Sequence, residues 1–159
     1  MKSLSFGWAG PDPLDIELAR PFHRASLWFG IRNSGPRFVT LWRSDGSGLR
    51  LSTEMHDVAE RTEVGLLNFE RVFEPQPNAL TVDVLPAFGL GVKVSKLIIH
   101  VSGTSAESGV ILKVQTGEEM VIVAGTYPYS LAIQGLMLSH PNIFQPEYPL
   151  ERYDRVPIT

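Results

Sequence analysis

The side chains best suited to chemistry are crowded into one ten-residue stretch, STEMHDVAER. It sets Glu54, His56, Asp57 and Glu60 close together, and Arg61 closes it. Carboxylates beside an imidazole are the groups that proteins use for acid–base catalysis and for binding divalent metals. On the solvated face of a strand, the same groups form an acidic patch suited to a protein partner. The backbone that carries them decides between these alternatives.

The spacing of the residues around this stretch favours a β-strand. Alternate side chains of a strand point to opposite faces. Here one face is mainly apolar and the other polar: Leu49, Leu51, Thr53 and Met55 against Arg50, Ser52, Glu54 and His56. In a helix, His56 and Glu60 would share a face, but the second histidine of the H-E-x-x-H zinc motif is missing. The alternation therefore favours a polar strand face, and the metal or acid–base site is the lesser alternative.

Composition argues against several classes of function. The 159 residues are 43% hydrophobic and 19% charged, which is typical of a globular protein. A net charge of −3 disfavours a general nucleic-acid-binding role, because such proteins need a basic surface. No cysteine is present, which removes disulfides and thiolate chemistry. No apolar run reaches the roughly 18 residues of a membrane-spanning segment, so we expect a cytoplasmic protein that does not enter the membrane.

No assembled catalytic or cofactor motif is found. The glycine-rich GLGVK, residues 89–93, lacks the spacing of a phosphate-binding loop. The serine-containing SGTSAESG, residues 102–109, does not fit a nucleophile elbow, and its composition predicts a flexible loop. We therefore expect a protein that is not an enzyme and needs no cofactor.

The pattern of short apolar runs predicts an all-β fold with at most one short helix. The predicted strands are residues 22–29, 37–43, 48–56, 63–72, 92–101, 109–115, 119–124 and 130–134. RSDGSG and QTGE have the composition of tight turns and predict two hairpins. Turn signals at intervals of roughly 8–12 residues indicate an antiparallel sandwich or a partly open barrel.

The chain length predicts one domain spanning residues 1–159. Residues 73–91 are rich in proline and glycine, and we interpret them as a crossover loop between two sheets. Residues 141–159 are punctuated by proline but keep apolar side chains, which predicts an extended C-terminal arm packed on the body.

The tyrosines all lie in the last part of the sequence, next to prolines or within the arm: Tyr127, Tyr129, Tyr148 and Tyr153. Tyrosine is enriched at the centres of protein interfaces, where its ring adds contact area at low entropic cost. The same residues are also suited to packing the arm onto the body. Both roles remain open from the sequence.

The stretch ESGVILKVQTGEEMVIVAGTYPYSLAI resembles part of small bacterial β-rich proteins of the toxin-immunity type. In those proteins an acidic residue and glycine precede a hairpin, and a V-A-G-x-x-P turn leads into a short closing strand. The resemblance covers residues 107–133. It implies a protein that binds and neutralises a cognate toxin, and it carries over no functional residue.

Together these patterns predict a non-catalytic protein that acts through contact with a protein partner, such as a toxin domain. The candidate partner-binding residues are Glu54, His56, Asp57, Glu60, Tyr127, Tyr129, Tyr148 and Tyr153. One alternative is a small β-barrel that binds or transforms a small molecule, with His56 and Glu54 lining its interior. Another is an assembly component that forms a homo-oligomer through exposed strand edges.

Overall fold

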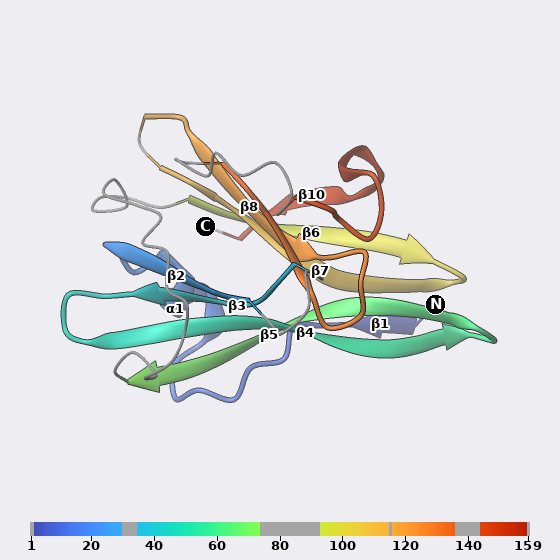
Figure 1. Ribbon diagram of the computed structural model, residues 1–159, viewed down its shortest axis with the longest axis horizontal. Helices are drawn as coiled ribbons and strands as arrows, with labels where there is room; N and C mark the ends of the chain where they lie inside the picture. The colour runs from blue at the N-terminus through green and yellow to red at the C-terminus, as the bar shows by residue number, and fades with distance from the viewer. Residues whose placement is uncertain (1, 30–34, 74–92, 115, 136–143, 159) are drawn as a thin grey trace.

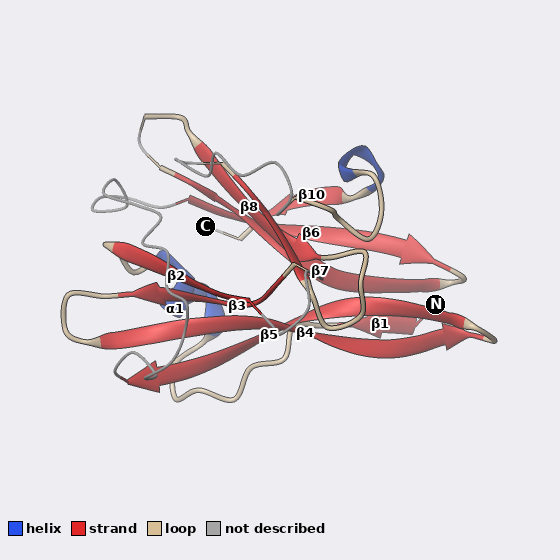
Figure 2. Ribbon diagram, viewed as in Figure 1, coloured by secondary structure: helices blue, strands red, loops and turns tan. Residues whose placement is uncertain are grey.

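The computed structural model describes residues 2–29, 35–73, 93–114, 116–135 and 144–158, which form two β-sheets (Figures 1 and 2). The first sheet has four strands in chain order: β2 (Arg24–Phe29), β3 (Pro36–Trp42), β4 (Ser47–Ala59) and β5 (Thr62–Phe73). The second has the order β10 (Asp154–Pro157), β6 (Lys93–Val101), β7 (Thr104–Lys113), β8 (Glu119–Ala124) and β9 (Leu131–Gln134). A short strand, β1 (Lys2–Leu4), pairs with β7 in parallel. The all-β prediction is confirmed, and the described strands do not close into a barrel.

Each of the eight predicted strands corresponds to an observed one, but the loop predicted at residues 102–109 is wrong. Only Ser102 and Gly103 form a turn there, and β7 begins at Thr104. The polar composition of this segment is compatible with a strand because Ser108 occupies a β-bulge opposite β6. A bulge places one extra residue on a strand and re-aims its side chain. The Ser108 side chain is buried as a result.

The main core lies between the two sheets. In β4, Leu49, Leu51 and Thr53 are buried, as the alternation predicts. Met55 is the next residue on this face, but it is partly exposed, so the buried part of the face ends at Thr53. The opposing residues come from the second sheet, chiefly Val94, Val110, Leu112, Met120, Ile122, Leu131 and Ile133. The burial of these apolar side chains between the sheets is the main contribution that stabilises a two-sheet fold.

A second apolar cluster covers the other side of the second sheet. It combines Val64 and Leu66 of β5 with side chains of β6–β9 such as Leu97, Ile99, Ile111, Val121 and Val123. The C-terminal arm, residues 144–158 as described, packs Phe144, Tyr148 and Leu150 against this cluster. The arm contains a 3-10 turn, η2 (Leu150–Arg152), and ends as β10 on β6. The crossover predicted at residues 73–91 lies outside the described residues, apart from Phe73 at the end of β5.

The outer edge of β5 is not left open. The N-terminal segment runs beside it, and Gly7 forms a parallel bridge with Asn68. The amide of Gly7 donates to the carbonyl of Leu67, and the amide of Phe69 donates to the carbonyl of Gly7. Two further hydrogen bonds continue this coverage at Gly65, whose amide donates to Glu147 Oε2 and whose carbonyl accepts from Ser108 Oγ.

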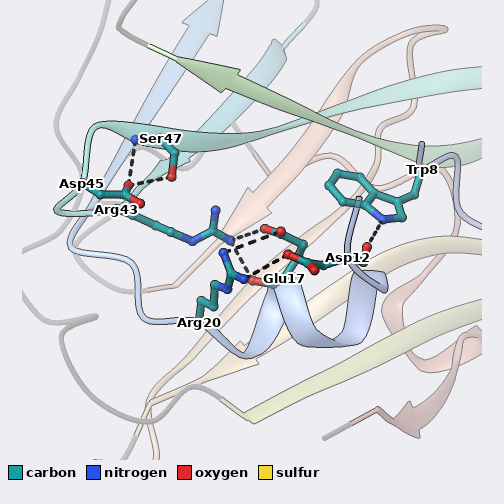
Figure 3. Close-up of polar contacts among 7 residues, drawn as sticks. All are labelled: Trp8, Asp12, Glu17, Arg20, Arg43, Asp45 and Ser47. Atoms are coloured by element: carbon teal, nitrogen blue, oxygen red, sulfur yellow. Dashed lines mark hydrogen bonds and ion pairs between the residues drawn. The ribbon is translucent and has the colours of Figure 1, made fainter. Parts of the chain in front are cut away.

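A short helix, α1 (Leu14–Ala19), is anchored to the first sheet by a buried ion pair (Figure 3). Glu17 is fully buried and Arg43 is 6% exposed. Arg43 Nη2 donates to the Glu17 carbonyl at 2.8 Å and lies 2.9 Å from Glu17 Oε2. Phe22 packs beneath the guanidinium, whose Cζ is 4.8 Å from the ring centroid. Burial lowers the pKa of Arg43, and the nearby Glu17 carboxylate opposes that effect.

Within the described part of the chain, no helix combines the length and apolar character required to cross a membrane.

Candidate functional site

Three segments that are distant in sequence meet beside the β4–β5 hairpin. The hairpin is joined to the turn between β8 and β9, because Thr53 Oγ1 donates to the Ser130 carbonyl at 2.9 Å. It is joined to the arm, because the Gly65 amide donates to Glu147 Oε2 at 3.0 Å. The candidate residues predicted from sequence come from these same three segments. The fold therefore links regions whose proximity the sequence does not reveal.

The tyrosine turn, residues 125–130, presents two aromatic rings to solvent. Tyr127 is 48% exposed and Tyr129 is 53% exposed. The amide and hydroxyl of Ser130 both donate to the Tyr127 carbonyl, at 3.1 and 2.6 Å. Thr126 is fixed from the other side, since its amide and hydroxyl donate to carbonyls of the arm. Tyr129 has a φ of +62°, a conformation that non-glycine residues adopt only when the surroundings enforce it.

The two tyrosines of the arm are less accessible. Tyr153 is 7% exposed and belongs to the second apolar cluster, so its ring is unavailable to a partner. Its hydroxyl oxygen accepts a hydrogen bond from the Tyr148 amide at 3.3 Å. Tyr148 is half-buried, and the Arg152 guanidinium stacks 4.8 Å from its ring centroid. Burial raises the pKa of both tyrosines. We therefore exclude Tyr153 from the candidate surface.

His56 and Glu54 are neighbours on the face of β4 opposite to Leu51 and Thr53. Their side chains are 37% and 54% exposed, and His56 Nε2 lies 3.6 Å from Glu54 Oε2. A metal would need a third ligand, yet the described residues contain no group of three or more histidines or carboxylates suited to one. The exposure of Glu54 also means that this pair lines no interior cavity. His56 Nε2 itself is buried and has no hydrogen-bond partner among the described residues, and the pair is charged on both sides only when His56 is protonated.

The tip of the β4–β5 hairpin is acidic, and we call it the acidic hairpin end. Asp57 and Glu63 lie directly opposite each other across the strands, and Glu60 is exposed in the turn. Like charges at opposed positions destabilise a strand pair. No described residue forms an ion pair with any of these three carboxylates. Figure 1 shows the hairpin reaching one end of the long axis, the end to which the β6–β7 hairpin also points.

Sequence reasoning missed Glu147, the residue that connects the arm to the hairpin. Its Oε2 accepts from the Gly65 amide, while Oε1 is buried without a hydrogen-bond partner among the described residues. Burial raises the pKa of Glu147 to about 7; the Gly65 hydrogen bond opposes this and the charge of Glu63 adds to it. Ser108 Oγ donates to the Gly65 carbonyl at 2.6 Å.

A usable signal for this contact was the glycine inside an apolar strand. A Cβ at Gly65 would lie 2.5 Å from Ala124 Cβ and 2.9 Å from both Glu147 Oε2 and Thr53 Cγ2. Glycine in a strand often marks the place where another backbone approaches closely. Gly65 thus predicts a crossing point, although the sequence alone does not say what crosses it.

Replacing Thr53 by valine is expected to lower the free energy of unfolding by about 1 kcal/mol, because it removes a buried hydrogen bond between hairpin and turn. The Ser130 carbonyl keeps the amide of Gly125 as a donor, which limits the loss. Urea denaturation measures the change. Ser52→Ala is the matched control, since Ser52 is half-exposed on the other face of β4. Equal stability of the two variants would contradict a role for the Thr53 contact.

The fold and this surface define a two-sheet β protein with an exposed aromatic turn tied to an acidic hairpin end. No protein-family model, curated protein or solved structure matches the chain.

Proposed function

We propose that this protein is a non-catalytic binding protein that acts through contact with a protein partner. The observation that carries the proposal is the tyrosine turn, where Tyr127 and Tyr129 are about half exposed on a backbone held by hydrogen bonds at both ends. Large exposed aromatic rings are common among the residues that dominate binding energy. A turn already fixed in the free protein loses little further entropy on association.

Electrostatics support a partner with a basic surface. Asp57, Glu60 and Glu63 gather three carboxylates at the acidic hairpin end, and the Thr53 hydrogen bond connects the same hairpin to the tyrosine turn. Complementary charge accelerates encounter and selects among partners more than it strengthens the final complex. We therefore assign most of the binding affinity to the rings of Tyr127 and Tyr129. The carboxylates of the acidic hairpin end would instead accelerate the encounter with a basic partner.

The resemblance to toxin-immunity proteins supports a more specific form of this proposal. The resembling segment, residues 107–133, contains the tyrosine turn. The partner in this form is a toxin domain with a positively charged surface, and the protein inhibits it by occupying that surface. A partner encoded by the adjacent gene is the first candidate to test.

Replacing Tyr127 by alanine is expected to weaken binding to the product of the adjacent gene about fivefold or more, because a tyrosine that dominates an interface contributes more than about 1 kcal/mol. Titration calorimetry with purified proteins measures the affinity. Phe73→Ala is the matched control, since Phe73 is 68% exposed but lies at the far end of β5 from the hairpin tip. It should leave the affinity unchanged.

Two results would count against the proposal. Unchanged affinity in Tyr127→Ala would remove the tyrosine turn from the interface. No binding by the wild-type protein to the neighbouring gene product would contradict the inhibitor form of the proposal.

A further inference from the structure

Glu147 occupies the point at which the arm holds the other two segments. Its amide donates to the carbonyl of Ala124 at 2.9 Å, directly before the tyrosine turn. Its carboxylate accepts from the Gly65 amide of β5. The two preceding residues, Gln145 and Pro146, supply the carbonyls that hold Thr126. A change in the position of Glu147 therefore reaches the tyrosine turn through the backbone hydrogen bonds of three consecutive arm residues, 145–147.

In neither protonation state does the Glu147 carboxyl group form hydrogen bonds through both of its oxygens. When it is ionised, a partly buried negative charge has one hydrogen bond, and Oε1 has none within the described residues. When it is protonated on Oε1, the charge is removed but the new O–H has no acceptor there. Burying a charge costs more than burying a neutral polar group, so the packed arm favours the protonated form.

Among the charged and titratable groups around Glu147, Glu63 reinforces this preference. These groups are Glu63 on β5 and Tyr148, Arg152 and Tyr153 on the arm. The residues of β4, β7 and β8 that contact Gly65 carry no charge: Thr53, Ser108 and Ala124. Glu63 repels the ionised carboxylate, while Arg152 is engaged with the ring of Tyr148. No described neighbour neutralises an ionised Glu147.

We propose that Glu147 is a proton-sensitive positioning residue, which holds the arm against β5 when protonated and loosens the tyrosine turn when ionised. The consequence for a partner rests on the proposed function: the binding surface is best ordered on the acidic side of the transition. The raised pKa, about 7, places the transition close to neutral pH. The mechanism requires no large motion, because residues 145–147 contact hairpin and turn directly.

Amide NMR of the free protein across neutral pH tests the proposal. In the wild-type protein the signals of Gly65, Thr126 and Tyr127 are expected to shift with one common midpoint near 7. Hydrogen exchange of the Thr126 amide should also rise more steeply with pH than in Glu147→Gln. In that variant, which keeps the size and hydrogen-bonding capacity of the side chain, the midpoint should be lost at all three amides.

Glu63→Gln is the matched control, because it removes the neighbouring charge but leaves the Gly65 contact in place. The common midpoint should move to lower pH and persist. A shift at Gly65 without one at Thr126 or Tyr127 would overturn the proposal, as would a midpoint that survives in Glu147→Gln. The measurement needs no partner, so the Glu147 proposal can fail while Tyr127→Ala still weakens partner binding, and the reverse also holds.

Discussion

Replacing Arg43 by methionine is expected to lower the free energy of unfolding by about 3 kcal/mol, because it leaves the buried Glu17 carboxylate with only Arg20, which is 40% exposed and whose Nη1 lies 3.8 Å from Glu17 Oε1. Glu17 is fully buried, and its two carboxylate oxygens have no hydrogen bond among the described residues to compensate. Methionine keeps most of the side-chain volume over Phe22, so the loss reports the charge more than a cavity. Urea denaturation at neutral pH measures it.

The double variant Glu17→Leu with Arg43→Met is expected to recover most of the stability, since replacing both members of a buried pair by apolar residues is often neutral or favourable. Arg50→Met is the matched control. Arg50 also pairs with a carboxylate, Glu70, but its partner is 56% exposed, and its loss should cost less than about 1 kcal/mol. If Arg43→Met and Arg50→Met lowered the free energy of unfolding equally, the buried ion pair at α1 would contribute no more to stability than an exposed one.

Glu147→Gln is expected to stabilise the protein above pH 7 by up to roughly 3 kcal/mol, because it removes the cost of ionising a partly buried carboxyl. The pKa of Glu147 is raised from 4.5 to about 7 by folding. The stability that accompanies the protonated group is therefore fully present below 4.5 and is lost as the pH rises through about 7. Glutamine carries no proton to lose.

Urea denaturation on both sides of that range provides the measurement. The wild-type protein and Glu147→Gln should have similar stability below pH 4.5 and diverge up to about 7. Glu119→Gln is a useful control, because Arg155 holds the pKa of Glu119 below its usual value. That carboxylate should instead add stability as the pH rises. Parallel stability curves for the wild-type protein and Glu147→Gln would contradict the buried-carboxyl interpretation.

The regular parts of this fold could be predicted because local chemistry and burial agree in them. The alternation through Leu49, Leu51 and Thr53 and the turn at Gly46, whose φ is +87°, are sufficient to predict the β3–β4 hairpin. The sequence pattern predicted at most one short helix but did not indicate which residues form it. Its six residues contain Glu17, a residue type normally solvated, whose burial depends on Arg43 from another segment.

The candidate site was only partly predictable, because sequence patterns do not reveal which segments meet. Tyr127 and Tyr153 both lie in irregular segments rich in turn-forming residues, yet one ring is exposed and the other buried. Their difference arises from the second apolar cluster, which covers one and not the other. Glu147 carried no local signal at all, since its properties come from Gly65 and Glu63, more than 80 residues earlier.

The contacts at Gly65 also protect the protein from aggregation through the edge of its first sheet. An outermost strand with free amides and carbonyls is a template for adding a foreign strand, and long flat ones promote aggregation. On β5 that template is blocked: Gly7 bonds with Leu67 and Phe69, and Glu147 and Ser108 bond to Gly65. The middle of β5, the second-longest strand of the described chain, is thereby protected from edge-to-edge growth, and the arm that shapes the proposed binding surface is part of that protection.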